Sequence, residues 1–313
     1  SDALRVFRDN KEFPLDPIEG RRASLAYLAE QETGAWAGAK YAMAKALKDL
    51  GLTKATIACD HVRVQALLEE ASDSKATVID ADEALRRIRP IKSAMEITLM
   101  RRAAKANTEA ALAAVHTVRA GATYRELRAT FYAEAAKRGN SGEFMVVDRV
   151  SADQFDAPFR DGQAFLIDAV SQGDGYHGDY GRTVFIGEPS KPMAQATKMI
   201  GAAWDEVRHA LKPGMKFSEI SALGQATLKK LGADYTVSFG PHSVGLYHTD
   251  HVGTKGSSAF REDHVLEKDM ILSVDCPMLE AGVGGSAHLE DLTLITETGS
   301  EQINDVGDQT IIV

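Results

Sequence analysis

The sequence predicts a two-domain α/β protein, and three features support this prediction. Helix-like and strand-like segments alternate before residue 90, a newly capped helix follows Pro90, and the segment after it repeats once at an offset of 93 residues. A chain of 313 residues that is 44% hydrophobic can bury two cores. We therefore expect a smaller N-terminal α/β domain over residues 1–90 and a larger domain over residues 91–313.

The first domain is expected to contain two helix–strand steps. The segment AWAGAKYAMAKALKDLG is helix-like and ends at Gly51, and a strand-like segment follows over residues 54–60. The segments VQALLEEA and ATVID repeat the same order. This alternation predicts a small α/β unit.

The second domain opens with a helix and contains an internal repeat. Ser93 and Glu96 form a capping box, and the helix is expected to run to about Val118. Residues 103–139 align with residues 196–232 with 10 identities in 37 positions. We interpret this as a duplication, in which two helix pairs cover one face of a sheet and leave the other face for a site. The alternative is two unrelated helix pairs with common turn chemistry.

Composition and net charge argue against several classes of partner. A net charge of −9 argues against a nucleic-acid partner, because phosphate binding needs clustered Lys and Arg. The densest basic run, RRIRPIK at residues 86–92, is expected to be a solvated connection between the domains. There is no apolar run of membrane-spanning length, and Cys59 and Cys276 lack CxxC spacing. We therefore expect a cytoplasmic protein without a membrane partner.

The apolar strand-like segments after residue 160 each present an acid or a histidine. These residues are Asp168, Asp179, His242, Asp275 and Glu290. An ionised carboxylate in an apolar strand is costly unless it is paired or bound to metal. Two divalent cations would cancel the four negative charges, and this ligand set suits Mn, Co, Fe or Zn. The alternative for each carboxylate is a salt bridge within the sheet.

Five segments together resemble a known family. They are RPIKSAMEITLMRRAAKAN, LIDAVSQGDGYHGDYGRTVFIG, GPHSVGL, ILSVDCP and HLEDLTLIT. They resemble the prolidase, aminopeptidase P and methionine aminopeptidase family of pita-bread metallohydrolases, which includes creatinase and prolidase-like lyases. The resemblance implies a duplicated pita-bread catalytic domain, a smaller creatinase-like N-terminal domain that looks shortened here, and a homodimer.

The resemblance also implies roles for individual residues. Asp168 would bind one ion, Asp179 and Glu290 would bridge both ions, and His242 and Asp275 would complete the shell of the other. A water held between the ions would attack the amide carbonyl of a short Xaa-Pro peptide or another small molecule. Asp275 would accept and then donate the proton.

The sequence departs from the family pattern at several positions. Asp275 stands where the family has glutamate, and His288 stands where the peptidases have arginine. Thr249 occupies the position of the peptidases' second catalytic histidine, and the loop SADQFDAPFRDGQAFLID lacks the histidine that usually precedes the first metal strand. The candidates for proton transfer in place of the second catalytic histidine are the titratable residues close to Thr249 in YHTDHVG, namely His248, Asp250 and His251.

These departures leave several functions open. The first is a Xaa-Pro peptidase or other amide hydrolase. The second is a lyase that cleaves dimethylsulfoniopropionate by β-elimination, which fits the 15-residue spacing from Asp275 to Glu290, although the base position of that group is His248 and not an acid. Creatinase-like C–N cleavage is a third. A metal-free binding protein is the last, and the retention of all five ligand residues argues against it.

Overall fold

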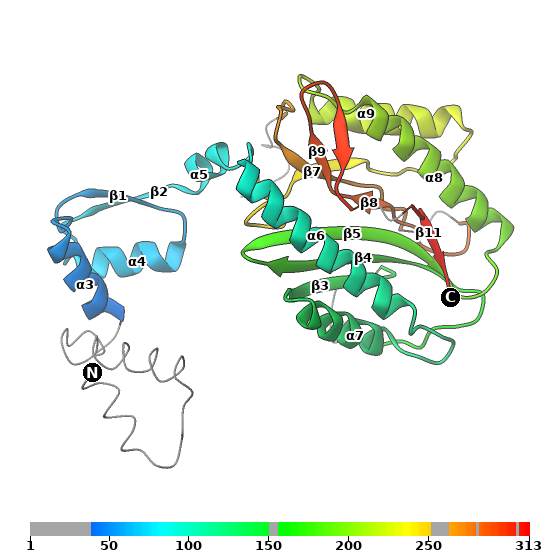
Figure 1. Cartoon of the computed structure of the whole chain (residues 1–313), viewed down its shortest axis with the longest axis horizontal. Coiled ribbons are helices and arrows are strands. Elements are labelled where there is room, and N and C mark those ends of the chain that lie inside the picture. Colours follow the sequence, from blue (N-terminus) through cyan, green and yellow to red (C-terminus); the bar gives the residue numbers. More distant parts are fainter. Residues whose placement is uncertain (1–38, 150–155, 252–262, 280–281, 305–306) are drawn as a thin grey trace, which may run out of the picture. The chain divides into compact units, whose positions relative to one another are not determined.

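The computed structural model describes residues 39–149, 156–251, 263–279, 282–304 and 307–313. The chain divides into two compact units, Ser1–Leu85 and Arg86–Val313. In the first unit β1 and β2 pair in parallel, and the order of helix and strand is the predicted one (Figure 1). Its elements are α3 (Ala39–Asp49), β1 (Thr56–Cys59), α4 (Val62–Ala71) and β2 (Thr77–Asp80), and α5 (Asp82–Ile88) follows.

The first half of the second unit is a helix pair followed by three strands. Its elements are α6 (Ala94–Val115), α7 (Tyr124–Lys137), β3 (Ser141–Val147), β4 (Ala164–Gly173) and β5 (Tyr176–Phe185). The predicted capping box is present, since Ser93 Oγ accepts from Glu96 N and Glu96 Oε2 accepts from Ser93 N. The helix α6 ends at Val115, slightly earlier than predicted, and packs across β4 and β5 (Figure 1).

The second half repeats the helix pair and then forms its own strands. Its elements are α8 (Lys191–Ala210), α9 (Phe217–Lys230), β6 (Gly240–Ser243), β7 (Ile271–Asp275), β8 (Glu290–Asp291), β9 (Thr293–Ile295), β10 (Ser300–Gln302) and β11 (Thr310–Ile312). Both ends of α7 and α9 differ by the predicted 93 residues. The turn glycines also match, because Gly121 and Gly214 have φ of 87° and 90°. The structure thus shows the predicted duplication.

The strands of the second unit form two sheets, and the first of these also takes β8 and β11 from the second half. The first sheet has the order β11-β5-β4-β3 with β8 also paired to β5, and the second has the order β10-β9-β7-β6. Each helix pair packs on a separate core, one containing Phe131 and Phe165 and the other Trp204 and Phe239. The helices thereby cover one face of each sheet and leave acids and histidines to the other face.

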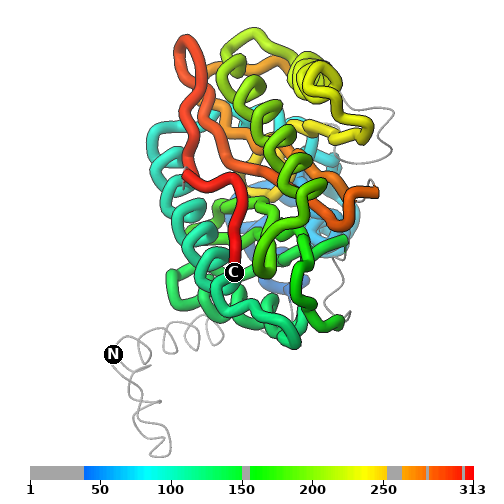
Figure 2. The backbone as a smooth tube through the Cα atoms, turned by 90° about the vertical axis from the view of Figure 1, so that its right-hand side faces the viewer, coloured from blue at the N-terminus to red at the C-terminus, as the bar shows by residue number. Residues whose placement is uncertain are grey.

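The C-terminal segment runs between the long helices of the two halves (Figure 2). Asn304 Nδ2 contacts Thr108 Oγ1 of α6 at 3.5 Å, and the side chain of Gln309 lies against Gly201 of α8. The last strand, β11, then pairs in parallel with β5 of the first half. The final residues therefore connect the two repeats.

The basic run at residues 86–92 is not the solvated connection that was predicted. Arg86 is 8% exposed and Lys92 is 3% exposed. Arg86 donates to the carbonyl of Thr249, and Lys92 Nζ donates to Ser243 Oγ. The prediction was wrong because acceptors far along the chain hold these cations. Among the helices described, none combines the length and apolar character needed to cross a membrane.

Candidate metal centre

Seven titratable side chains from both sheets form one cluster. They fall into three overlapping groups, within each of which the possible metal-ligand atoms lie within 4.8 Å of one another. The members are Asp168, Asp179, His242, His248, Asp275, His288 and Glu290. All five residues predicted as ligands are therefore brought together, with two further histidines.

The hairpin of β4 and β5 places its two aspartates on one face. Asp168 lies opposite Gly181, and Asp179 lies opposite Val170, two residues along each strand. Glu290 of β8 also pairs with Gly181 from the other side. A Cβ atom on Gly181 would lie 2.2 Å from His288 Cδ2 and 2.9 Å from Glu290 Cβ. Glycine at this position therefore leaves the space that the side chains of His288 and Glu290 occupy.

The second sheet supplies the histidine ligand candidate and the last aspartate. In the antiparallel pair of β6 and β7, His242 lies opposite Ser273 and Gly240 lies opposite Asp275. His242 and Asp275 therefore share a face. Ser273 Oγ donates to Glu290 Oε1 at 2.7 Å and so joins the second sheet to the β8 carboxylate.

The distances around His242 match those between ligands of one ion. Its Nε2 atom lies 3.4 Å from Glu290 Oε1, 3.5 Å from Asp179 Oδ2 and 3.7 Å from Asp275 Oδ2. Yet neither ring nitrogen of His242 has a hydrogen-bond partner among the described residues. Ligand atoms at about 2.0–2.2 Å from an ion lie roughly 3.0–3.5 Å from each other. The arrangement suits a shared cation better than direct hydrogen bonds.

Two aspartates each carry a buried oxygen without a hydrogen-bond donor among the described residues. Within the described part of the chain, neither Asp168 Oδ1 nor Asp179 Oδ1 accepts a hydrogen bond. A buried acceptor without a donor costs free energy, and a carboxylate oxygen costs more than a neutral group. These atoms are therefore the ones at which a bound cation would relieve an unfavourable state.

The pKa values show how strongly the groups interact without a cation. Burial, followed by the charge of Glu290, raises the pKa of Asp168 and of Asp275 well above the usual range. Burial opposes the charged form of the histidines, but Glu290 and its neighbours outweigh it and raise the pKa of His242 to about 10 and that of His288 to about 9. Without metal ions, the crowded carboxylates and the histidines beside them thus keep protons. Bound metal ions could replace these protons.

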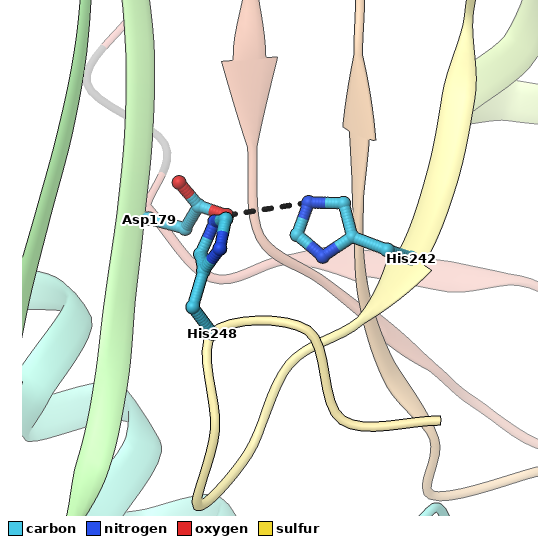
Figure 3. Close-up of side chains that lie close together, drawn as sticks. All are labelled: Asp179, His242 and His248. Atoms are coloured by element: carbon cyan, nitrogen blue, oxygen red, sulfur yellow. Dashed lines mark hydrogen bonds and ion pairs between the residues drawn. The ribbon is translucent and has the colours of Figure 1, made fainter. Parts of the chain in front are cut away.

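His248 comes from the loop after β6 and not from a strand. It lies beyond β6, and its Nε2 atom is 3.1 Å from Asp179 Oδ2 (Figure 3). Its ring stands edge-on to Phe144, with the centroids 5.2 Å apart. Burial opposes protonation of this ring, but Asp179 raises the pKa of His248 above its usual value. Of the three proton-transfer candidates in YHTDHVG, this is the one that the structure brings to the cluster.

The other two candidates lie elsewhere. Asp250 is fully buried and pairs with Arg89, whose Nη2 atom is 2.9 Å from Asp250 Oδ1. His251 Nδ1 accepts from Ser243 N at 3.3 Å, and its ring packs against Phe217. Neither belongs to the three groups that could hold a metal.

His288 belongs to the cluster, although from the sequence it is only a departure from the family pattern. Its Nε2 atom lies 2.9 Å from Glu290 Oε2 and 3.8 Å from Asp275 Oδ1. The available signal was its position two residues before Glu290, because alternate residues of an extended segment share a face.

Comparison with known proteins assigns the family. The profile of metallopeptidase family M24 matches residues 98–297. The probable dipeptidase PepE of Mycobacterium tuberculosis is 28% identical over 273 residues, which cover 84% of this chain and 71% of the relative. The Xaa-Pro dipeptidase of Pyrococcus horikoshii is 24% identical over 233 residues, which cover 71% of this chain and 64% of the relative.

Solved structures agree on the fold. The X-Pro aminopeptidase of Thermotoga maritima superposes with a TM-score of 0.73 at 20% identity, covering 88% of this chain and 78% of that one. The prolidase of Pyrococcus furiosus gives a TM-score of 0.70 at 20% identity, covering 83% and 80%. The predicted family and pita-bread fold are confirmed. The chain belongs to metallopeptidase family M24, and it is a metallopeptidase-like hydrolase.

Proposed function

We propose that this protein hydrolyses the amide bond of Xaa-Pro dipeptides with the help of two divalent metal ions. The observation that carries the proposal is a single cluster in which buried atoms of Asp168, Asp179 and His242 have no hydrogen-bond partner among the described residues. The names of the relatives, a probable dipeptidase and a Xaa-Pro dipeptidase, support the substrate class.

The seven residues suit two ions better than one. The group of Asp168, His288 and Glu290 and the group of Asp179, His242 and His248 share no member. The third group, of His242, Asp275 and Glu290, links them. Four carboxylates with imidazoles are a donor set for Mn, Co, Fe or Zn. Each of the two separate groups would hold one ion, and Asp275 would add a carboxylate through the third group, which shares His242 and Glu290 with them.

Metal ions at this cluster would polarise the scissile carbonyl and lower the pKa of a bound water. The side chains of the cluster would supply the remaining functions, which are proton transfer and metal binding. Asp275 is the candidate for proton transfer, because its side chain is 36% exposed whereas those of Asp179 and Glu290 are 0% and 1% exposed. Only Asp275 among these three can both face a substrate and reach the cluster. The buried carboxylates of Asp179 and Glu290 would bind the metal ions and keep them in position.

The first experiment is metal analysis of the purified protein with an assay on a Xaa-Pro dipeptide. We expect about two transition-metal ions per chain and Mn- or Co-dependent cleavage. Asp179→Asn keeps the shape of the side chain but removes its charge, and it should abolish both. Asp174→Asn, at an exposed aspartate paired with Arg102, is the matched control and should change neither. A metal-loaded protein without amide hydrolysis would refute the substrate class.

The same assay tests the lyase alternative. The 15-residue spacing of Asp275 and Glu290 favours it, although His248 and not an acid occupies the position of that group's base. Release of dimethyl sulfide from dimethylsulfoniopropionate would assign a lyase. A chain that takes up neither Mn, Co nor Zn would support a binding protein of the same fold instead.

A further inference from the structure

The loop that carries His248 is held together by a buried aspartate next to it. Asp250 Oδ2 accepts from Leu246 N at 3.1 Å, and Asp250 N donates to Ser243 O at 2.7 Å. These bonds tie the start of the loop to its end, with His248 between them. Asp250 is fully buried, so its charge requires compensation from within the protein.

Two arginines provide that compensation and contact the residues on either side of His248. Arg89 Nη2 lies 2.9 Å and Arg86 Nη1 lies 3.6 Å from Asp250 Oδ1. We call Arg86, Arg89 and Asp250 the arginine–aspartate cluster. Arg86 also donates to the carbonyl of Thr249 at 2.8 Å.

The residue before His248 is held by the same side chains. The guanidinium groups of Arg86 and Arg89 lie over the ring of Tyr247, 4.9 Å and 5.1 Å from its centroid. Tyr247 and Thr249 are the two chain neighbours of His248. Since both are fixed by the arginines, the backbone from which His248 projects has little freedom to turn its ring away from Asp179 (Figure 3).

We propose that Asp250, through the arginine–aspartate cluster, is a positioning residue that fixes His248 against Asp179. The inference rests on the proposed function, because it gives His248 a part in the metal centre. It assigns to Asp250 an indirect role, in place of the direct proton transfer predicted from the sequence. Arg86 and Arg89 come before the duplicated segment in the sequence. Through their contacts with Asp250 they would nevertheless help to position His248 at the metal centre.

Gly245 offers an independent way to disturb the same arrangement. A Cβ atom there would lie 2.6 Å from Asp250 Oδ2 and 3.4 Å from Lys92 Nζ. Gly245 lacks the positive φ that would strain an alanine backbone, so the main effect of Gly245→Ala is to displace the carboxylate. We therefore expect Gly245→Ala to act on His248 in the same direction as the loss of the Asp250 charge.

The test is a double-mutant cycle of Asp250→Asn and His248→Ala in the full chain, with Co²⁺ as the metal probe. Asp250→Asn alone should lower kcat on a Xaa-Pro dipeptide about 10- to 100-fold, as loss of a supporting partner typically does. It should also shift the visible Co²⁺ spectrum toward that of His248→Ala. In the His248→Ala background it should cost less than about twofold more. Arg102→Met, at an exposed ion pair, is the control.

Each outcome decides the question. Equal losses in both backgrounds, or a wild-type Co²⁺ spectrum in folded Asp250→Asn, would overturn the inference. If Asp250→Asn does not fold, Arg89→Met and Gly245→Ala replace it in the same cycle, and Arg89→Lys should restore part of the activity. If the wild type cleaves no Xaa-Pro dipeptide, the proposed function fails, while the Co²⁺ spectra still decide whether Asp250 positions His248.

Discussion

His248 Nε2 lies 3.1 Å from Asp179 Oδ2 and connects a loop to the buried hairpin strand β5. Its pKa is raised by Asp179, so without metal the imidazole is predisposed to carry a proton toward this carboxylate. A cation bound by His248 itself would reverse that preference, because a metal-ligating imidazole must be deprotonated.

Replacement of this histidine should therefore weaken metal binding. We expect His248→Ala to lower Mn²⁺ affinity or kcat about 10- to 100-fold, measured by calorimetric titration of the metal-free protein and by a dipeptide assay. His209→Ala, at an exposed histidine in the last turn of α8, is the matched control and should bind like the wild type. Equal Mn²⁺ affinity and equal kcat in both variants would exclude a role for His248.

Metal uptake should release protons, and affinity should rise with pH. The pKa values of His242 and His288 are about 10 and about 9 without metal, so both rings are protonated at neutral pH and must lose their protons to bind an ion. Each displaced proton makes affinity rise roughly tenfold per pH unit below these values. Calorimetry in buffers of different ionisation enthalpy measures the protons released. A pH-independent affinity would show that these histidines are not ligands.

The stability of the metal-free protein should fall as pH rises from neutral to about 10. The folded pKa values of His242 and His288 exceed the usual value of about 6.5, so their stabilisation is fully present below that value and is lost through about 9 to 10. The raised pKa of Asp168 adds a cost above its unfolded pKa and does not reverse this trend. Thermal unfolding from pH 6 to 10, with and without Mn²⁺, should show a stabilisation by metal that grows with pH.

The glycine beneath the cluster should resist substitution. Gly181→Ala places a methyl group 2.2 Å from His288 Cδ2, and overpacking of this kind costs about 1–3 kcal/mol in the free energy of unfolding. Because His288 and Glu290 must move, metal affinity should also fall. Gly299→Ala is the control, since a Cβ atom there would lie 4.0 Å from Leu211 O and, apart from its chain neighbours, no closer to any other described atom. Chemical denaturation and metal titration of both variants provide the comparison.

Local patterns predicted the parts of the fold that depend on nearby residues. The capping box of Ser93 and the turn glycines are set by contacts within a few residues, and the repeat offset fixed the bounds of α9 from those of α7. The spacing of Asp168 and Asp179 matched a hairpin because alternation and a tight turn determine which side chains share a face. The homodimer stays a prediction.

Contacts between distant segments were not readable in the same way. Arg89 and Asp250 are separated by 161 residues, so no local pattern joins them, and the basic run was assigned to solvent. The entry of His248 into the cluster depends on the path of a loop, which alternation does not describe. Sequence spacing therefore predicted which candidate ligands on strands lie close together better than it predicted the loop and ion-pair contacts around them.

The return of β11 to the first sheet has a consequence for how the protein is made. The edge of β5 receives β8 only at residue 290 and β11 only at residue 310. During synthesis this edge of β5 therefore stays unpaired until segments more than a hundred residues later in the chain have been made. Such a nascent chain presents an unpaired strand to its neighbours on the ribosome, where binding of a chaperone would protect it from aggregation.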